Sequence, residues 1–225
     1  MAHVGIVGGH GKIALLTAPL LVEAGHEVTS IVRNPDHVGD VEATGATALV
    51  ADISALSTEE IKELFTEQGF DALVWSAGAG GGDPERTIAV DRDAAIRTMD
   101  AASAVGPERY VMVSYLGASL DHGVPEDNDF HTYAQAKAEA DEHLRGTSLK
   151  WTLVGPTSLS LDEPSGSIEI TTTPGDVKAS RANVARVIAA VLADDSTIGK
   201  ALPFTDGDVP IAEAVAQAPA SERLA

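Results

Sequence analysis

The sequence lacks cysteine and contains few aromatic residues. Its 225 residues include two tryptophans, three tyrosines and four phenylalanines. Without cysteine the chain forms no disulfide, thiol nucleophile, cysteine-ligated zinc site or iron-sulfur cluster. Any chemistry must therefore come from other side chains or from a bound small molecule.

Basic residues are also scarce. Thirty-four aspartates and glutamates against fifteen lysines and arginines leave a formal net charge of -19. This charge repels the phosphates of nucleic acids and of anionic membranes, so we expect neither as a partner. The nearly apolar stretches 13–22 and 184–193 are shorter than the roughly 20 residues of a membrane span, and the first residues show no signal peptide. We expect a soluble, cytoplasmic protein.

Short β-branched runs alternate regularly with helix-like segments. This alternation is typical of a parallel sheet covered by helices on both faces, and 44% hydrophobic residues provide enough apolar material for its core. The pattern predicts an α/β fold with a Rossmann-type, doubly wound parallel sheet, in a single domain over residues 1–225. The six expected strands are residues 4–7, 28–32, 46–50, 72–76, 110–114 and 151–154.

Helices are expected between these strands. The first covers residues 13–22, and we expect it to bend because Pro19 removes one backbone hydrogen bond. The others are expected around residues 61–65, over 87–105, from 129 onward and over 181–192.

The alternation of strand-like and helix-like segments ends after the sixth strand. Residues 155–166 are rich in proline, serine and glycine, and residues 168–173 alternate like a short exposed strand. We interpret residues 155–173 as a small lid over the substrate. A last strand is expected at 202–205, a small helix from Pro210, and a frayed tail over residues 216–225.

A glycine-rich turn joins the first strand to the first helix, with the spacing Gly8-x-x-Gly11-x-x-Ala14. Glycine allows a tight turn and a close backbone approach, and the helix N-terminus directs N–H groups at an anion. The alternative is an ordinary strand-to-helix turn that contains glycine. Because the turn follows the first strand of a βαβ unit, we predict that it binds the pyrophosphate of a dinucleotide. The predicted binding residues are Gly8, His10, Gly11, Lys12 and Ile13.

Arg33 follows the second strand, where an acidic residue would accept hydrogen bonds from a ribose 2′-hydroxyl. A guanidinium is suited to a 2′-phosphate instead, and Lys12 could assist it. NADP is therefore favoured over NAD. The alternative is a solvated surface arginine.

Residues after the third and fourth strands are candidates for the adenosine site. Asp52 could accept a hydrogen bond from the adenine amino group, or it could cap the helix that follows. Residues 76–82, Ser-Ala-Gly-Ala-Gly-Gly-Gly, offer small side chains beside the cofactor or form a mobile loop. We include Asp52, Ile53, Ala77 and Gly78 among the cofactor-binding residues.

Tyr133 and Lys137 are four residues apart in a helix-like segment, so both side chains lie on one helical face. A free phenol has a pKa of about 10, and a nearby ammonium favours the phenolate. We therefore expect Lys137 to lower the pKa of Tyr133 and make it an acid-base group.

The glycine turn, Ser114 at the end of the fifth strand, and Tyr133-x-x-x-Lys137 together resemble the short-chain dehydrogenase/reductase superfamily over nearly the whole chain. The turn spacing and short C-terminal part are similar to its atypical NAD(P)-binding members, which are related to sugar epimerases. The resemblance implies that Tyr133 is the general acid or base, that Lys137 holds the nicotinamide ribose, and that Ser114 orients the substrate carbonyl. We add Pro156, after the sixth strand, to the cofactor-binding residues.

Two positions depart from the superfamily's pattern. Asp91 occupies the place of the usual tetrad asparagine, and an ionised carboxylate does not donate the hydrogen bond that a water-mediated proton relay needs. Gly155 stands where related proteins often carry arginine before Pro156, which makes nucleotide-sugar binding less favoured. We keep Asp91 as a candidate catalytic residue.

Other catalytic motifs are missing from the sequence. His122 and His131 flank the candidate site but have no close metal-ligand spacing, so we read them as loop histidines and expect no metal. The G-x-S-x-G motif of serine hydrolases is also absent.

The favoured function is an NADP-dependent oxidoreductase that transfers hydride to or from a small carbonyl, alcohol or quinone, with Tyr133 as the proton donor. One alternative is an NADPH-binding redox sensor without turnover, which Asp91 keeps open. Another is an epimerase that retains its cofactor. The filled positions Ser114, Tyr133 and Lys137 favour the enzyme. We expect a small-molecule substrate and a monomer or homodimer.

Overall fold

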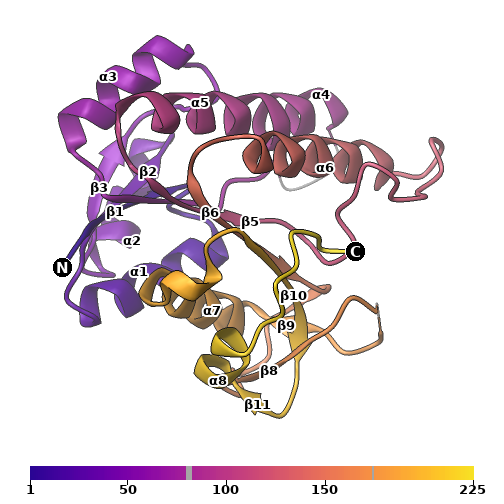
Figure 1. Ribbon diagram of the computed structural model, residues 1–225. Helices are drawn as coiled ribbons and strands as arrows, with labels where there is room; N and C mark the ends of the chain where they lie inside the picture. Colours follow the sequence, from indigo (N-terminus) through magenta and orange to yellow (C-terminus); the bar gives the residue numbers. More distant parts are fainter. Residues whose placement is uncertain (80–82, 174) are drawn as a thin grey trace.

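A central sheet runs through the computed structural model of the chain, which describes residues 1–79, 83–173 and 175–225. Figure 1 shows helices on both faces of this sheet. Within the described ranges its strand order is β11-β8-β10-β6-β5-β4-β1-β2-β3. The strands are β1 His3–Val7, β2 Glu27–Val32, β3 Thr47–Val50, β4 Ala72–Trp75, β5 Arg109–Val113, β6 Lys150–Pro156, β8 Ser167–Ile170, β10 Lys200–Asp206 and β11 Val209–Pro210.

The helices follow the expected alternation. Two short strands, β7 Leu159–Ser160 and β9 Ala179–Ser180, form a separate parallel pair. The α-helices are α1 Lys12–Glu23, α2 Val38–Glu42, α3 Thr58–Gln68, α4 Pro84–Thr87, α5 Ala95–Val105, α6 His131–Arg145, α7 Arg181–Ala193 and α8 Ile211–Ala216, with η1 Pro35–His37, η2 Ile88–Ala94 and η3 Asp195–Thr197 as 3₁₀ or π-helical segments.

The parallel order of the sheet places the candidate site. β1 pairs in parallel with β2 on one side and with β4 on the other, so the direction of winding reverses at β1. In open α/β sheets, ligands bind at the carboxyl ends of the strands where this reversal occurs. The glycine turn leaves β1 at that point. The predicted doubly wound α/β fold is confirmed.

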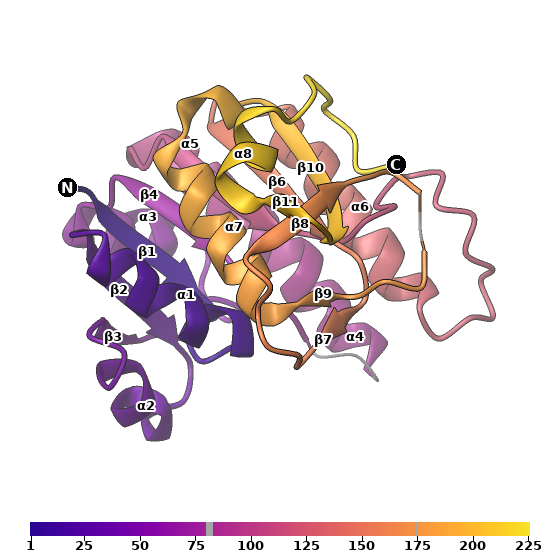
Figure 2. The same cartoon turned by 90° about the horizontal axis from the view of Figure 1, so that it is seen from below.

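Two hydrophobic clusters hold the layers together. One lies between the sheet and α1, α7 and α8, which Figure 2 shows in front of the strands. The other lies between the opposite face and α3, α5 and α6. Each face of the sheet is therefore buried, as the apolar strand sequences require.

The helix expected over 87–105 contains a π-helical segment. α4, η2 and α5 follow one another without a break, and η2 covers Ile88–Ala94. Such segments are rare and occur frequently at functional sites. Asp91 lies in this one and is 1% exposed.

Two C-terminal expectations were wrong. The strand expected over residues 168–173 is present as β8, Ser167–Ile170, but its expected exposure was wrong, because β8 pairs antiparallel with β10 and Ile168 is fully buried. The tail from residue 216 was expected to fray. Instead Leu224 is fully buried and its carbonyl accepts a hydrogen bond from the Gly117 N–H at 2.8 Å.

Local details of two helices also bear on the predictions. α1 runs through Pro19 to Glu23, and its bend stays a prediction. α3 begins after Ser57, which forms a capping box with Glu60. In the part of the chain that the structure describes, no helix combines the length and apolar character needed to cross a bilayer.

Candidate active site

The glycine turn is packed tightly between the ends of β2 and β4. Gly8 has a φ of 82°, and a Cβ atom on it would lie 2.6 Å from the backbone N and Cα of Ala77. A Cβ on Gly9 would lie 2.5 Å from the Cβ of Ser30. Both positions therefore require glycine, as the sequence predicts for a close strand-to-helix turn.

The first turn of α1 can accept an anion. Gly11 is its N-cap, the first turn has no acidic residue, and no side chain in the described ranges caps it. The N–H groups at this end of the helix therefore keep their capacity to bind an oxyanion. The turn fits the pyrophosphate of a dinucleotide.

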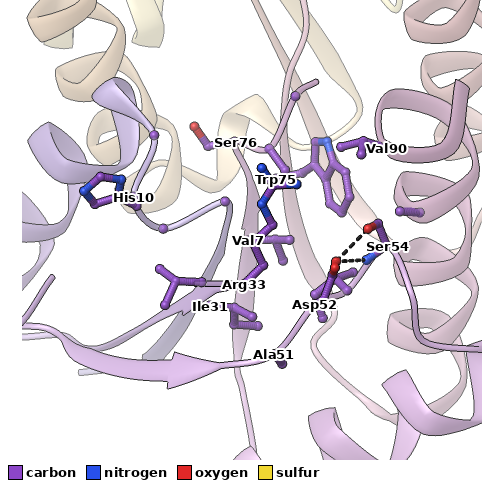
Figure 3. A pocket seen from close by; sticks show the side chains of 18 of the residues that line it. Val7, His10, Ile31, Arg33, Ala51, Asp52, Ser54, Trp75, Ser76 and Val90 are labelled. Atoms are coloured by element: carbon purple, nitrogen blue, oxygen red, sulfur yellow. Dashed lines mark hydrogen bonds between the residues drawn. The ribbon is translucent and has the colours of Figure 1, made fainter. Parts of the chain in front are cut away.

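A cavity of about 270 Å³ lies beside this turn, at the ends of β1, β2, β3 and β4. Figure 3 shows the Arg33 side chain extending over it, between His10 on one side and Asp52 on the other. Arg33 is exposed. The predicted cofactor residues that line this cavity are Gly8, His10, Gly11, Arg33, Asp52, Ile53, Ala77 and Gly78.

Asp52 shapes the rim of this cavity. Its Oδ1 accepts hydrogen bonds from the Ser54 backbone N–H at 3.1 Å and from the Ser54 hydroxyl at 2.6 Å, as Figure 3 shows. The helix-cap alternative for Asp52 was wrong, because Ser57 caps α3. Asp52 instead fixes the turn that follows β3.

Sequence reasoning missed His37, which also lines the cavity beside the glycine turn. Its ring stacks on that of His10 with centroids 3.6 Å apart, and His10 Nε2 lies 2.8 Å from Asp40 Oδ2. The pairing joins η1 to the glycine turn. The sequence does not predict this stacking of the two rings, because the two histidines are 27 positions apart.

A second, larger cavity of about 910 Å³ continues from the first. The two cavities share Gly11, Ser76, Ala77 and Gly78, so they form one cleft along the carboxyl edge of the sheet. Predicted residues lining the larger cavity include Lys12, Ile13, Asp91, Ser114, Tyr133, Lys137 and Pro156. Every predicted site residue thus lies on one of the two cavities.

Tyr133 lies in the first turn of α6, within an aromatic group. Its ring centroid is 5.8 Å from that of Tyr115 and 5.2 Å from that of Phe130. Burial raises the pKa of Tyr133, and a negative charge on Asp91 or Asp141 raises it further. The net shift is upward, and a lowering of this pKa by Lys137 stays a prediction. Tyr133 therefore holds its proton.

Lys137 lies one helical turn beyond Tyr133 and is 1% exposed. Its Nζ donates a hydrogen bond to the Val113 carbonyl at 2.8 Å. Burial lowers the pKa of Lys137, while the charges of Asp141 and Asp91 oppose that effect. Lys137 thus ties α6 to the end of β5.

Asp91 anchors the chain beyond β4. Its Oδ2 accepts a hydrogen bond from the Ala79 N–H at 2.9 Å. Burial raises the pKa of Asp91, partly offset by Lys137. The glycines at 80–82, which belong to the run singled out in the sequence, lie outside the described residues.

Asp141 is the buried acidic residue that sequence reasoning missed. It is 0% exposed, and its Oδ2 lies 2.5 Å from the hydroxyl oxygen of Ser114. The spacing Tyr133, Lys137, Asp141 continues the same helical face by another four residues, which was an available signal.

The space beside Gly155 is filled by the C-terminal segment. A Cβ on Gly155 would overlap the Leu224 side chain. The Leu116 N–H donates to the Pro156 carbonyl at 2.9 Å, and Leu224 accepts from the next residue, Gly117. The C-terminal segment therefore supports the loop that follows Ser114.

Comparisons with known proteins cover the whole cleft. Residues 8–195 match the model of a family described as NAD(P)H-binding. The chain is 32% identical to a UPF0659 protein of Schizosaccharomyces pombe, over 94% of this chain and 92% of that protein. It is also 32% identical to YhfK of Bacillus subtilis, named an uncharacterized sugar epimerase, over 93% of this chain and 97% of that protein.

A solved structure from Bacillus halodurans has the same fold. Its name describes it as a candidate NAD-dependent epimerase/dehydratase. Its TM-score is 0.87 at 32% identity, and the match covers 96% of this chain and 100% of that one. The family match extends from Gly8 to beyond Arg181 and so contains the lining residues of both cavities except Val7.

Proposed function

Because the chain belongs to the NAD(P)H-binding family, we propose that it is an NADP-dependent oxidoreductase of the atypical short-chain dehydrogenase/reductase type. Its substrate would be a small carbonyl compound, alcohol or quinone. The observation that carries the proposal is one continuous cleft, with an uncapped glycine turn at one end and Ser114 and Tyr133 at the other.

The smaller cavity would hold the adenosine half of the cofactor. The backbone of the glycine turn and the start of α1 would bind the pyrophosphate. Arg33, exposed at the end of β2, would bind the 2′-phosphate through its planar guanidinium. Asp52 and Ile53 would lie against the adenosine, and Pro156 against the nicotinamide half.

The larger cavity would hold the reacting groups. Bound NADPH supplies a hydride to the substrate carbon. Tyr133, whose pKa is raised by burial, keeps its proton and would give it to the substrate oxygen. Ser114 would orient that oxygen, and Lys137 would hold the nicotinamide ribose. The direction favoured by a protonated phenol is reduction.

The segment 155–173 would contribute the substrate side of the cleft. Thr157, Ser158 and Leu159, all from this segment, line the larger cavity. The lid role of this segment rests on that placement.

Oxidation of NADPH, followed at 340 nm against a panel of aldehydes, ketones and quinones, tests the proposal. Tyr133→Phe should lower the rate about 10²- to 10⁴-fold, because the phenol oxygen supplies the proton. Its affinity for NADPH, measured by calorimetry, should stay close to that of the parent. Equal rates in parent and variant would remove Tyr133 as the proton donor.

Cofactor choice is tested separately. Arg33→Ala should weaken NADPH binding much more than NADH binding, because only NADPH carries the 2′-phosphate. An equal loss for both coenzymes would contradict the role of Arg33. Arg186, which is exposed on α7 and lines neither cavity, offers a control arginine.

A cofactor-retaining epimerase is the second candidate, favoured by the names of the Bacillus relatives. Against it, Leu224 fills the space at Gly155, where an arginine for a nucleotide sugar would be needed. Tightly held cofactor with no NADPH oxidation on any substrate of the panel would favour the epimerase or a redox sensor.

A further inference from the structure

The hydrogen bond between Ser114 and Asp141 limits what Ser114 can do. Ser114 Oγ and Asp141 Oδ2 lie 2.5 Å apart, and both residues are buried. A serine hydroxyl has one proton to donate. If that proton goes to an ionised Asp141, Ser114 has none left for a substrate oxygen.

The alternative arrangement releases the serine proton. A neutral Asp141 donates its own proton to Ser114 Oγ, and the Ser114 hydroxyl is then free to donate into the cavity that it lines. The separation of 2.5 Å is at the short end for O–H···O bonds and fits either donor. The choice between the two depends on the surroundings of Asp141.

Those surroundings oppose a charge on Asp141. The side chain is 0% exposed, and its Oδ1 has no hydrogen-bond partner among the described residues. An ionised carboxylate with one unpartnered buried oxygen is strongly disfavoured over the neutral acid. Among the described residues no ion pair includes Asp141, because Arg145 pairs with Glu142 and Lys137 Nζ donates to the Val113 carbonyl.

Two charged groups act on Asp141, and both lie on its own helix. Lys137 and Arg145, from the same helix α6, favour the carboxylate, as does the Ser114 hydrogen bond at the end of β5, while burial outweighs them and raises the pKa of Asp141. A negative charge on Asp141 would also raise the pKa values of Tyr133 and Tyr115. Asp91, from η2, stabilises the positive charge of Lys137 and so acts to raise its pKa.

The charge balance of the buried site points the same way. Lys137 is a fully buried cation, and both Asp91 and Asp141 act on it. Arg86 and Arg145 also favour the two carboxylates, but both arginines are more exposed than Lys137. Asp91 accepts a backbone hydrogen bond from Ala79, which favours its ionised form. One carboxylate neutralises Lys137, and a second would leave an unbalanced buried charge.

We infer that Asp141 is a positioning residue that carries a proton at neutral pH and donates it to Ser114, so that the Ser114 hydroxyl donates to the substrate oxygen. The substrate contact rests on the proposed function, whereas the proton on Asp141 does not. Asp91, Lys137 and Asp141 together would then be neutral.

Carboxyl ¹³C NMR of the whole chain labelled on aspartate tests the proton directly. Asp91→Asn and Asp141→Asn assign the two signals by their disappearance. At pH 7 we expect the Asp141 carbon at the chemical shift of a carboxylic acid and the Asp91 carbon at that of a carboxylate. A carboxylate shift for Asp141 at pH 7 overturns the inference.

The same variants test the role of Asp141 on any substrate that the 340 nm assay identifies. An asparagine at 141 still donates to Ser114, so Asp141→Asn should keep kcat within about threefold. Asp141→Ala removes the donor and should lower kcat at least tenfold without changing the Kd of NADPH. If Asp141→Asn loses as much as Asp141→Ala, a donor at position 141 does not position Ser114 and the inference fails.

Failure of the proposed function would look different. A chain that binds neither NADPH nor NADH would contradict the oxidoreductase, while the NMR signal of Asp141 would still report its proton. A chain that binds and oxidises NADPH but shows an ionised Asp141 would keep the oxidoreductase and overturn the positioning role. Thermal melting of each variant confirms that it is folded.

Discussion

Replacing Gly8 by alanine tests the tight glycine turn on which the cofactor site depends. Gly8 has a φ of 82°, and an added Cβ would lie 2.6 Å from the N and Cα of Ala77. The change therefore adds two penalties at once. One is the left-handed backbone conformation, and the other is a collision with backbone that no side-chain rotation relieves.

The magnitude follows from these two effects. A residue with a Cβ in the left-handed region costs about 1–2 kcal/mol, and an overpacked contact adds about 1–3 kcal/mol. We expect Gly8→Ala to lower the free energy of unfolding by about 2–5 kcal/mol. For a chain of this length that corresponds to a fall in Tm of about 4–20 °C.

Gly25→Ala is the matched control. Gly25 also has a positive φ, 84°, but a Cβ there meets nothing within 4 Å. This variant should lose only the backbone penalty of about 1–2 kcal/mol. Both variants can be measured by urea unfolding, followed by the fluorescence of the buried Trp75 and Trp151.

Cofactor binding separates the two variants further. Gly25→Ala should bind NADPH as the parent does, because Gly25 lies in the turn between α1 and β2, outside both cavities. Gly8→Ala should bind it much more weakly, because relieving the collision moves the turn. If Gly8→Ala is no less stable than Gly25→Ala and binds NADPH equally well, the reasoning about the turn is refuted.

Three further predictions concern stability. Leu224→Ala should cost about 2–5 kcal/mol in urea unfolding, because the side chain is fully buried against Gly155; a loss below about 0.5 kcal/mol would show that the tail is frayed after all. Arg109→Met should cost about 1–3 kcal/mol, because it removes the hydrogen bonds of the Arg109 guanidinium to the Lys150 carbonyl, the Val191 carbonyl and Thr197 Oγ1, and an unchanged Tm would contradict this. Burial raises the pKa of Asp91, so the stability that Asp91 contributes is present below the unfolded pKa of about 4 and is lost as pH rises through the folded pKa. The free energy of unfolding of Asp91→Asn should therefore rise relative to that of the parent as pH increases from 4 to 7. If the parent gains stability relative to Asp91→Asn over this range, the pKa of Asp91 is lowered and the prediction is wrong.

Much of the fold could be predicted because it depends on local patterns. The β-branched runs gave all six central strands of the sheet, with ends that differ by a few residues from those observed. The glycine turn was readable because Gly8 and Gly11 sit between the first strand and the first helix. The capping box of Ser57 and Glu60 was equally local, and would have excluded Asp52 as the cap of α3.

The remaining features depend on contacts between distant segments. The burial of Leu224 requires Gly155, 69 positions earlier in the sequence, to leave space for it. The raised pKa of Tyr133 depends mainly on its depth in the fold, with a further contribution from the Asp91 carboxylate in η2. The pattern Tyr133-x-x-x-Lys137 identified the pair but contained no information on burial, which decides the sign of the shift.

A crystal structure of the chain with NADP⁺ tests the central claim most directly. The account predicts the pyrophosphate on the backbone between Gly8 and Ile13, the 2′-phosphate within hydrogen-bond distance of Arg33, and the nicotinamide in the larger cavity near Tyr133. A dinucleotide bound elsewhere, or no dinucleotide at saturating concentration with the glycine turn unobstructed, would contradict it.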